Sequence, residues 1–401
     1  MTLHPRAGRR PSAIPAGIWS LGFVSLFMDV SSEMIHALLP VYLVTVLGAS
    51  MLAVGVLEGI AEGTASIVKV FSGALSDWLG KRKFLLALGY GLAAFTKPIF
   101  PLAPSVDWLV AARCIDRVGK GIRGAPRDAL VADLAPPELR GAAFGLRQAL
   151  DTVGAFVGPA AAIGLMWLTA DDFRAVFWVA VIPGFVALAL VLFAVREPKR
   201  AAATPRPRFP LHIGELKQLG GIFWLIVAVA TVFTLARFSE AFLILRAQTE
   251  GMAIMLVPAV LILMNVAYAL SAYPFGALSD RVDRVAVLIA GFALLIVADI
   301  VLALASDLAG VLIGVALWGL HLGMTQGLLA ALVADAVPAR LRGTAYGMFN
   351  LLGGLALVAA SIVAGLLWDA FGPQGTFFAG AGLTFAALLG LVAIRGRLAM
   401  R

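Results

Sequence analysis

The sequence predicts an all-α membrane protein with twelve transmembrane helices in two pseudo-symmetric six-helix bundles. The composition is the first reason: of 401 residues, 61% are hydrophobic and 13% are charged, whereas roughly a quarter of an ordinary soluble domain is charged. Long apolar stretches recur along the whole chain, and about 20 such residues span a bilayer as a helix. The third reason is that the two halves of the chain resemble each other.

The apolar stretches mark the individual crossings. Each is long enough to cross a hydrocarbon core about 30 Å thick. We place them at 16–46, 50–76, 84–105, 107–134, 142–169, 174–195, 219–247, 252–276, 285–305, 308–336, 344–369 and 375–396.

The loops between these crossings differ in charge. Lys and Arg gather in alternate loops and in both tails, as in the run Lys81, Arg82, Lys83, while the opposite loops hold acids such as Asp171 and Asp172. By the positive-inside rule, both termini are expected in the cytoplasm. The formal charge of +8 is therefore a topology signal, and no nucleic-acid partner is expected. The sequence favours a bacterial cytoplasmic (inner) membrane, with no signal peptide and no disulfide at the sole cysteine, Cys114.

An internal repeat divides the chain. The segment ALVADLAPPELRGAAFG at 129–145 returns as ALVADAVPARLRGTAYG at 331–347, with 11 of 17 positions identical, and GALSD at 73–77 returns at 276–280. Two matches at nearly one spacing indicate a duplicated six-helix unit. We predict an N-terminal bundle at 1–195, a basic, Pro-rich cytoplasmic linker at 196–218 and a C-terminal bundle at 219–401.

Three motifs resemble those of the major facilitator superfamily. GALSDWLGKRKFLL at 73–86 resembles the loop between its second and third helices, although Trp78 stands where the family usually has a positive residue. RCIDRVGKGIRGAPRDALVAD at 113–133 resembles its fourth helix, with Arg117 in the matching place. VGAFVGPAAAIG at 153–164 resembles the fifth-helix motif of drug/proton antiporters. The resemblance implies a carrier that works by alternating access.

Two of these motifs supply candidate gating residues. In the loop motif, the positive side chains would form a breakable latch with acidic groups or helix ends of the neighbouring half. In the fifth-helix motif, small residues four apart let helices approach closely and a proline permits a bend, so plain packing is an equal alternative to gating. The candidates are Gly73, Asp77, Lys81, Arg82, Gly154, Gly158 and Pro159.

Ionisable residues form stripes inside the predicted crossings. At about 100° per residue, Asp29, Glu33 and His36 fall within about 60° of one another. The second crossing carries Glu58, Glu62 and Lys69 on one stripe, and the fourth carries a basic stripe. Charged groups in a membrane usually face a bundle interior or a watery cavity. The stripes therefore predict a polar cavity, with structural ion pairs as the alternative; Lys69 and Arg127 are also near enough to helix ends to snorkel.

A proton-coupled carrier needs a carboxylate that exchanges protons, and a basic site favours an anionic or zwitterionic substrate. The acidic stripes favour cations instead, so the sign of the substrate stays open. Asp299 is expected to be structural or outward-facing. The candidates for proton coupling are Asp29, Glu33, His36, Glu58, Glu62, Asp151 and, by resemblance, Arg117. The candidates for substrate binding are Arg113, Lys120, Arg123, Arg147, Arg237, Glu240, Asn265, His321, Gln326 and Asn350.

The sequence thus favours proton-coupled efflux, by antiport, of a small amphipathic or anionic compound. The alternatives are an organic-anion uniporter or importer, a divalent-metal exporter that uses Asp29, Glu33 and His36, and a transport-inactive membrane receptor. Nucleotide-binding, metalloprotease and nucleophile-elbow motifs are absent from the sequence, which argues against an enzyme. The expected partners are a small-molecule substrate, protons and the lipid bilayer, and we expect a monomer with no cofactor and no bound metal.

Overall fold

The computed structural model describes residues 14–136, 139–198, 216, 218–279, 281–338 and 341–399. Helices form nearly all of this part of the chain. In chain order they are α1 (Ala16–His36), α2 (Leu39–Thr45), α3 (Met51–Leu79), α4 (Arg82–Thr96), α5 (Ile99–Leu102), α6 (Val106–Leu134), α7 (Arg140–Leu168), α8 (Phe173–Phe193), α10 (Gly220–Ala236), α11 (Ala241–Thr249), the 3₁₀ helix η2 (Ile254–Leu256), α12 (Ala259–Ser279), α13 (Arg284–Leu304), α14 (Leu308–Asp335) and α15 (Arg342–Ala399).

The twelve predicted crossings are confirmed. Among the described residues, 10 helical stretches are long and apolar enough to span a membrane. Helix α6 is equally long but carries too many charges to qualify by composition. Helix α15 contains two crossings, because Gly372 has a φ of 71° at a break within its 58 residues. A positive φ is unstrained only for glycine, which places the turn between the last two crossings there.

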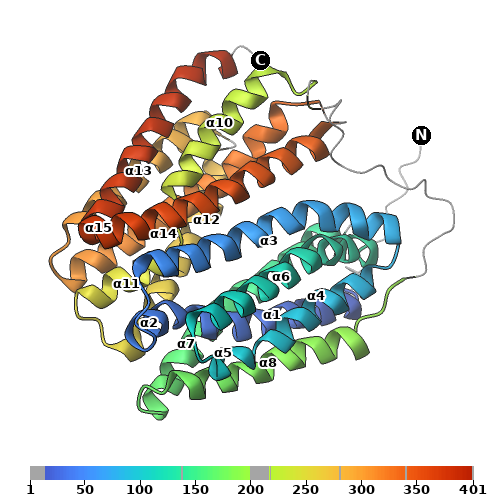
Figure 1. Ribbon diagram of the computed structural model, residues 1–401. Coiled ribbons are helices and arrows are strands. Elements are labelled where there is room, and N and C mark those ends of the chain that lie inside the picture. Colours follow the sequence, from blue (N-terminus) through green and yellow to red (C-terminus); the bar gives the residue numbers. More distant parts are fainter. Residues whose placement is uncertain are drawn as a thin grey trace, which may run out of the picture.

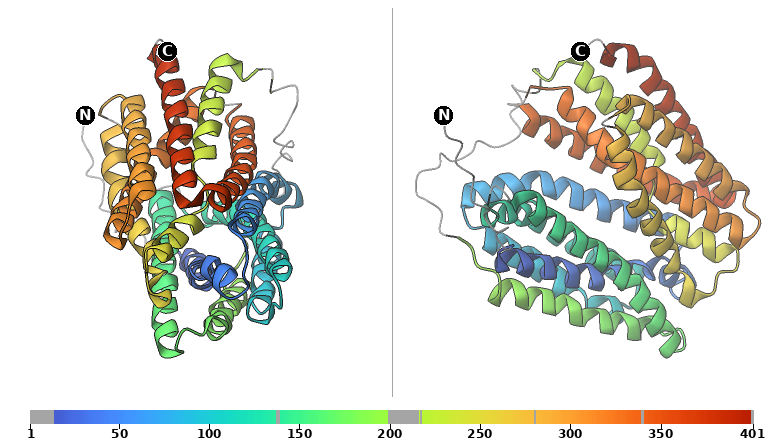
Figure 2. Two further views of the ribbon diagram at one scale, coloured as in Figure 1. Left: turned by 60° about the vertical axis from the view of Figure 1, so that its left-hand side comes forward. Right: turned by 180° about the vertical axis from the view of Figure 1, so that it is seen from behind.

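The helices form two packed groups, seen in blue to green and in yellow to red in Figures 1 and 2. In the first group, α1 packs against α7 and α8, and α6 packs against α3 and α4. In the second group, α14 packs against α12 and α13, and α15 packs against α10 and α13. The principal contacts between the groups are α3 with α15, α7 with α12 and α2 with α11. Most of the predicted linker lies outside the described residues.

Three of the predicted crossings are interrupted. The first breaks between α1 and α2, the third at Lys97 and Pro98, and the seventh between α10 and α11. Pro98 explains the break in the third crossing, because a proline has no backbone N–H to continue the helix. Breaks of this kind are tolerated in a membrane where neighbouring groups bind the freed backbone atoms. The crossing predicted at 219–247 therefore consists of two helices, α10 and α11, with a break between them.

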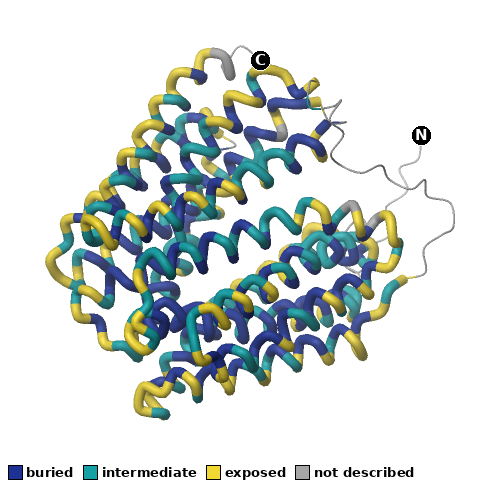
Figure 3. The backbone as a smooth tube through the Cα atoms, viewed as in Figure 1, coloured by how far each residue is buried: buried dark blue, intermediate teal, exposed yellow. Residues whose placement is uncertain are grey.

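Burial follows the layout expected for a protein in lipid. Figure 3 shows exposed residues along the outer faces of both groups, and many of them are large and apolar, such as Phe193, Trp167 and Leu270. The interior holds apolar clusters, including the stacked rings of Phe233 and Phe292. Ionisable side chains are buried as well, which an ordinary soluble core seldom allows.

The two groups meet most closely along α3 and α15. A Cβ added at Gly55 would lie 2.2 Å from the carbonyl oxygen of Ser361, and one at Gly365 would lie 2.4 Å from that of Met51. Small residues let the two helix backbones touch. At the start of α3, the carboxylate of Asp369 accepts hydrogen bonds from the backbone N–H groups of Met51 (3.0 Å) and Leu52 (2.9 Å). One helix group thus caps a helix of the other.

Candidate functional site

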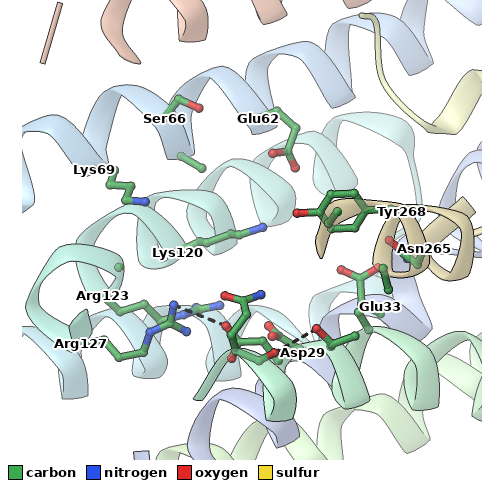
Figure 4. A pocket seen from close by; sticks show the side chains of 18 of the residues that line it. Asp29, Glu33, Glu62, Ser66, Lys69, Lys120, Arg123, Arg127, Asn265 and Tyr268 are labelled. Carbon is green, nitrogen blue, oxygen red and sulfur yellow. Dashed lines mark hydrogen bonds and ion pairs between the residues drawn. The ribbon is translucent and has the colours of Figure 1, made fainter. Parts of the chain in front are cut away.

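A cavity of about 710 Å³ lies between the two helix groups. Helices α1, α3, α6 and α7 form one wall, and α12 forms the other (Figure 4). This volume is in the range that holds a small organic molecule, about 300–1,000 Å³. Its lining residues are Asp29, Glu33, Glu62, Ala65, Ser66, Lys69, Lys120, Arg123, Gly124, Arg127, Gln148, Asp151, Thr152, Ala155, Asn265, Tyr268, Ala269, Ala272 and Tyr273.

Close packing of α1 on α7 sets the acidic wall. A Cβ at Gly154 would lie 2.9 Å from the Cβ of Asp29, and one at Gly158 would lie 2.7 Å from the Cβ of Glu33. These two glycines of the fifth-helix motif therefore lie directly behind the two acids that line the cavity. Pro159 is buried beside them. The arrangement is tight helix packing, and a gating role for these residues stays a prediction.

Glu33 is the first member of a chain of charged groups that leads away from the cavity. Its Oε2 lies 3.4 Å from Nδ1 of His36, whose Nε2 lies 3.6 Å from Oε2 of Glu58. Glu58 is fully buried and lies 3.3 Å from Nη2 of Arg113. Arg113 is thus held behind the cavity wall, and its position gives no support to the predicted contact with substrate.

A second chain begins at Glu62. Its Oε1 lies 3.2 Å from Nη1 of Arg117, and Nε of Arg117 lies 4.0 Å from Oδ2 of Asp116. Asp116 in turn accepts a hydrogen bond of 3.0 Å from Lys97. Buried ions persist only when partners of opposite charge compensate them. The deeper charges are thus arranged as ion pairs, as the structural alternative expects, and a role for them in proton coupling stays a prediction.

Asp151 has its own basic partner on α7. Its Oδ2 accepts a hydrogen bond of 2.6 Å from Nη1 of Arg147 and lies 3.8 Å from Nη2 of Arg127. Arg147 also contacts Gln148 and Asp128. Arg147 is therefore engaged with the wall, and it is not among the residues that line the cavity.

Four other lining residues have no ion-pair partner within the described part of the chain. They are one acid, Asp29, and three bases, Lys69, Lys120 and Arg123. Arg123 is 5% exposed, and its guanidinium lies 4.7 Å from the centre of the Tyr90 ring. The Lys69 side chain lies along Gly124 of α6. Its Cε would be 3.7 Å from a Cβ added at Gly124. The three bases thus gather at the α3–α6 side of the cavity.

Lys69 and Arg127 line the cavity although the sequence analysis did not select them as site residues. Snorkelling toward the membrane surface was left open for both, which kept them out of the predicted site, yet both line the cavity. The available signal was the position of Lys69 on the same stripe as Glu58 and Glu62. Tyr273 was missed altogether, because a tyrosine in an apolar helix carries no signal that separates a cavity wall from a lipid face.

The α12 wall is uncharged, and it includes Asn265 as predicted. Tyr268 lies beside it, and Figure 4 shows its hydroxyl directed toward Lys120. Gln326 and Asn350 are exposed and are not among the lining residues. His321 is fully buried between Trp318 and Phe233. Substrate contact by Gln326, Asn350 and His321 has no support from their positions.

Arg237 and Glu240 lie at the interruption between α10 and α11. The guanidinium of Arg237 lies 5.7 Å from the centre of the Phe233 ring, and Glu240 is the N-cap residue of α11. The freed backbone N–H of Ser239 donates to the hydroxyl of Ser361 in α15 at 3.2 Å. The interruption is thereby fastened to the helix that packs on α3, and neither ionisable residue lines the cavity.

Asp299 is not outward-facing. It is fully buried in α13, and Gly380 of α15 packs against it so closely that a Cβ there would lie 2.7 Å from Oδ2. Neither carboxylate oxygen of Asp299 accepts a hydrogen bond from the described residues. Its position is within the second helix group, away from the cavity lining.

The loop motif makes its contacts within the first helix group. Arg82 is buried and pairs with Asp133 of α6. It also donates a hydrogen bond of 2.7 Å to the carbonyl oxygen of Ala129. Lys83 donates a hydrogen bond of 2.8 Å to the carbonyl oxygen of Leu192, near the end of α8. The partners described here for these two residues belong to their own half, so the latch to the neighbouring half stays a prediction.

The other residues of that motif have different surroundings. Gly80 ends α3 with a φ of 64°, a conformation that favours glycine. Lys81 is exposed, Gly73 is half-buried in α3, and the side chain of Asp77 lies outside the described residues. The repeat reproduces the main contact, since Arg284 pairs with Asp335 at 2.5 Å.

Comparisons with known proteins agree with this geometry. The family model of the Major Facilitator Superfamily matches residues 21–266 and 249–398. An uncharacterized MFS-type transporter of Methanocaldococcus jannaschii, MJ1317, is 33% identical, with 94% of each chain covered. The inner membrane transport protein YajR of Escherichia coli is 26% identical over 90% of this chain and 80% of its own.

Similarity to a solved structure and to a further relative is more distant. A crystal structure of the nucleoside transporter NupG superposes with a TM-score of 0.79 at 12% identity, covering 94% of this chain and 100% of NupG, which shows the fold alone. The multidrug resistance protein MdtH of Photorhabdus laumondii is 29% identical over 47% of this chain and 46% of its own. The matched family model and the full-length relative, together with two helix groups around a central cavity, show that this chain belongs to the major facilitator superfamily of membrane transporters.

Proposed function

We propose that the protein exports a small amphipathic or anionic compound in exchange for protons, by alternating access of the central cavity. The observation that carries the proposal is the cavity between the two helix groups, where four carboxylates, Asp29, Glu33, Glu62 and Asp151, line one wall. Proton exchange needs carboxylates that water can reach, and transport needs a site that both groups enclose. The partial likeness to a multidrug resistance protein supports export.

The contacts between the helix groups support alternating access. Asp369 caps α3 at the end of the cavity remote from Lys69 and Arg127. With both termini in the cytoplasm, as the positive charges predict, this state is closed toward the outside and its cavity leads inward. Rocking the two groups about the α3–α15 contact would reverse that access.

The charge balance favours one second candidate, an organic-anion carrier without proton coupling. Three of the four unpaired lining residues are bases. A divalent-metal exporter has no comparable support: within the described residues, no group of three His, Cys, Asp or Glu side chains is arranged to hold a metal ion.

Inverted vesicles from cells that overproduce the protein provide the test. Respiration acidifies the vesicle interior and quenches the fluorescence of acridine dyes, so that a compound exchanged for protons restores the fluorescence. We expect recovery with some members of a panel of amphipathic cations, anions and zwitterions, and none with vesicles that carry Glu33→Gln. Transport of labelled compound without fluorescence recovery would instead support the uncoupled carrier.

A further inference from the structure

The unpaired charges of the cavity point to a substrate with charges of both signs. Glu33, Glu62 and Asp151 each have a basic partner, at 3.4, 3.2 and 2.6 Å respectively. Asp29 has no such partner among the described residues, and neither Lys120 nor Arg123 has an acidic one. A bound molecule can therefore neutralise these groups without first breaking an ion pair.

The two kinds of unpaired charge lie on different helices. Lys120 and Arg123 are one turn apart on α6, and Lys69 reaches the same helix at Gly124. Asp29 belongs to α1 and lies where that helix packs closely against Gly154 of α7. Figure 4 shows Lys120 extending into the cavity from α6, while Asp29 lies at a different place on the same wall, on α1. The side of the cavity opposite these charges is the neutral wall of Asn265 and Tyr268.

We propose that the substrate is an amphipathic zwitterion whose anionic head binds Lys120 and Arg123, with Lys69, and whose ammonium group binds Asp29. Its uncharged part would rest on the α12 wall, since Tyr268 offers an aromatic surface. An Arg and two Lys side chains suit a carboxylate, phosphate or sulfonate head. This inference rests on the proposed function and specifies its substrate class.

Exchange with protons is the reason to prefer a zwitterion over a simple anion. Binding an anion becomes easier when Asp29 is protonated, so an anion and a proton would bind together, which is the linkage expected of symport. An ammonium group instead competes with the proton for the Asp29 carboxylate. The groups around Asp29 are Lys120, Arg123 and Arg127 of α6 and Asp151 of α7. These four groups surround the Asp29 carboxyl group both when it is protonated and when it binds an ammonium group. The competition is therefore between the proton and the ammonium group for the same carboxylate.

Three fluorescent probes that differ only in charge test the proposal. Nε-dansyl-lysine is a zwitterion; dansylcadaverine is the same molecule without the carboxylate, and N-dansyl-6-aminohexanoic acid is the same molecule without the amine. Binding is titrated with the full chain in lipid nanodiscs, with empty nanodiscs as the blank. We expect the zwitterion to bind at least about tenfold more tightly than either singly charged probe, since one good ionic contact contributes about that factor.

Variants then assign each charge. We expect Lys120→Gln to remove the advantage of Nε-dansyl-lysine over dansylcadaverine, and Asp29→Asn to remove its advantage over N-dansyl-6-aminohexanoic acid. Asp107→Asn, at an exposed position in the first turn of α6, is the control and should change neither ratio. In weakly buffered solution, scanned across the pH range in which carboxylates titrate, Nε-dansyl-lysine should release protons from the wild-type chain and not from Asp29→Asn.

The wild-type titrations alone can overturn the proposal, whatever the variants do. Equal or tighter binding of either singly charged probe contradicts a zwitterion site, and so does the absence of saturable binding of all three. The two proposals also fail separately. A zwitterion preference without fluorescence recovery in inverted vesicles rejects proton-coupled export and keeps the substrate class, whereas recovery with other compounds and no zwitterion preference does the reverse.

Discussion

Gly158 of α7 lies directly against Glu33 of α1, so that a Cβ at position 158 would come within 2.7 Å of the Glu33 Cβ. The glycine is therefore required by the distance between two helices rather than by its own backbone conformation. The acid that lines the cavity is held in place by a residue with no side chain. The glycine of the fifth-helix motif, which resembles that of antiporters, thus allows α1 to approach α7 closely where Glu33 lines the cavity.

This contact predicts the effect of Gly158→Ala. The added methyl group forces α1 away from α7, and overpacking of this kind costs about 1–3 kcal/mol, so the melting temperature in detergent should fall and transport should weaken. Gly164→Ala in the same helix is the control, because nothing lies within 4 Å of its Cβ position. That variant should melt at the same temperature or slightly higher, since alanine favours helices. Equal melting of both variants would contradict the close contact.

The carboxylate of Asp369 predicts a shift between conformations. Asp369→Ala removes two hydrogen bonds that join the helix groups, and loss of a helix cap costs about 0.5–2 kcal/mol. The closed state at that end should lose several-fold in population. Spin labels at Asp171 and Ala253 in a Cys114→Ser chain measure the separation. The matched control is Asp307→Ala, which removes a helix-capping hydrogen bond of 2.8 Å from Gly310 N–H within one helix group. An equal change in the label separation in this control would contradict a specific role of Asp369 in holding the two groups together.

Coupling is predicted to depend on Glu33 and Arg117. Glu33→Gln removes a titratable group from the cavity wall, and Arg117→Ala leaves Glu62 without the partner that lies 3.2 Å away. Both variants should lose gradient-driven transport at normal expression, while Asp107→Asn should retain it. Proton-dependent flux at wild-type rates in both variants would remove these two residues from the mechanism.

The two copies of the loop contact predict unequal stability effects. Arg82 is buried against Asp133, whereas Arg284 and Asp335 are partly exposed, with side chains 33% and 60% accessible. Arg82→Gln should therefore cost about 1.5–3 kcal/mol, as for hydrogen bonds to charged groups, and Arg284→Gln less than about 1 kcal/mol. Thermal unfolding in one detergent compares them. Equal losses would mean that burial does not distinguish the copies.

Cavity-lining residues of α12 should matter more than polar residues elsewhere in the second group. Asn265→Ala and Tyr268→Phe should weaken binding of Nε-dansyl-lysine, because both side chains line the cavity. Gln326→Ala should leave the titration unchanged, because Gln326 is exposed and does not line it. A stronger effect at Gln326 than at Asn265 would contradict this assignment of the wall.

The sequence was sufficient for the membrane fold because lipid imposes a simple rule. Every crossing needs a long apolar helix, and buried charges must face away from lipid. The stripe of Asp29 and Glu33 therefore identified the inner face of α1, and the glycines of α7 identified a close contact. Each of these signals lies within the sequence of a single helix, so each can be recognised without knowing which helix packs against it.

Only the tertiary structure decided which charges are available. Glu62 and Asp29 look alike in the sequence, yet Glu62 has Arg117 at 3.2 Å and Asp29 has no ionic partner among the described residues. A helical stripe gives the angle of a side chain about its own axis, but not its depth or the residue opposite. Those depend on how separate helices pack, and for that reason Lys69 joined the cavity while Gln326 and Asn350 did not.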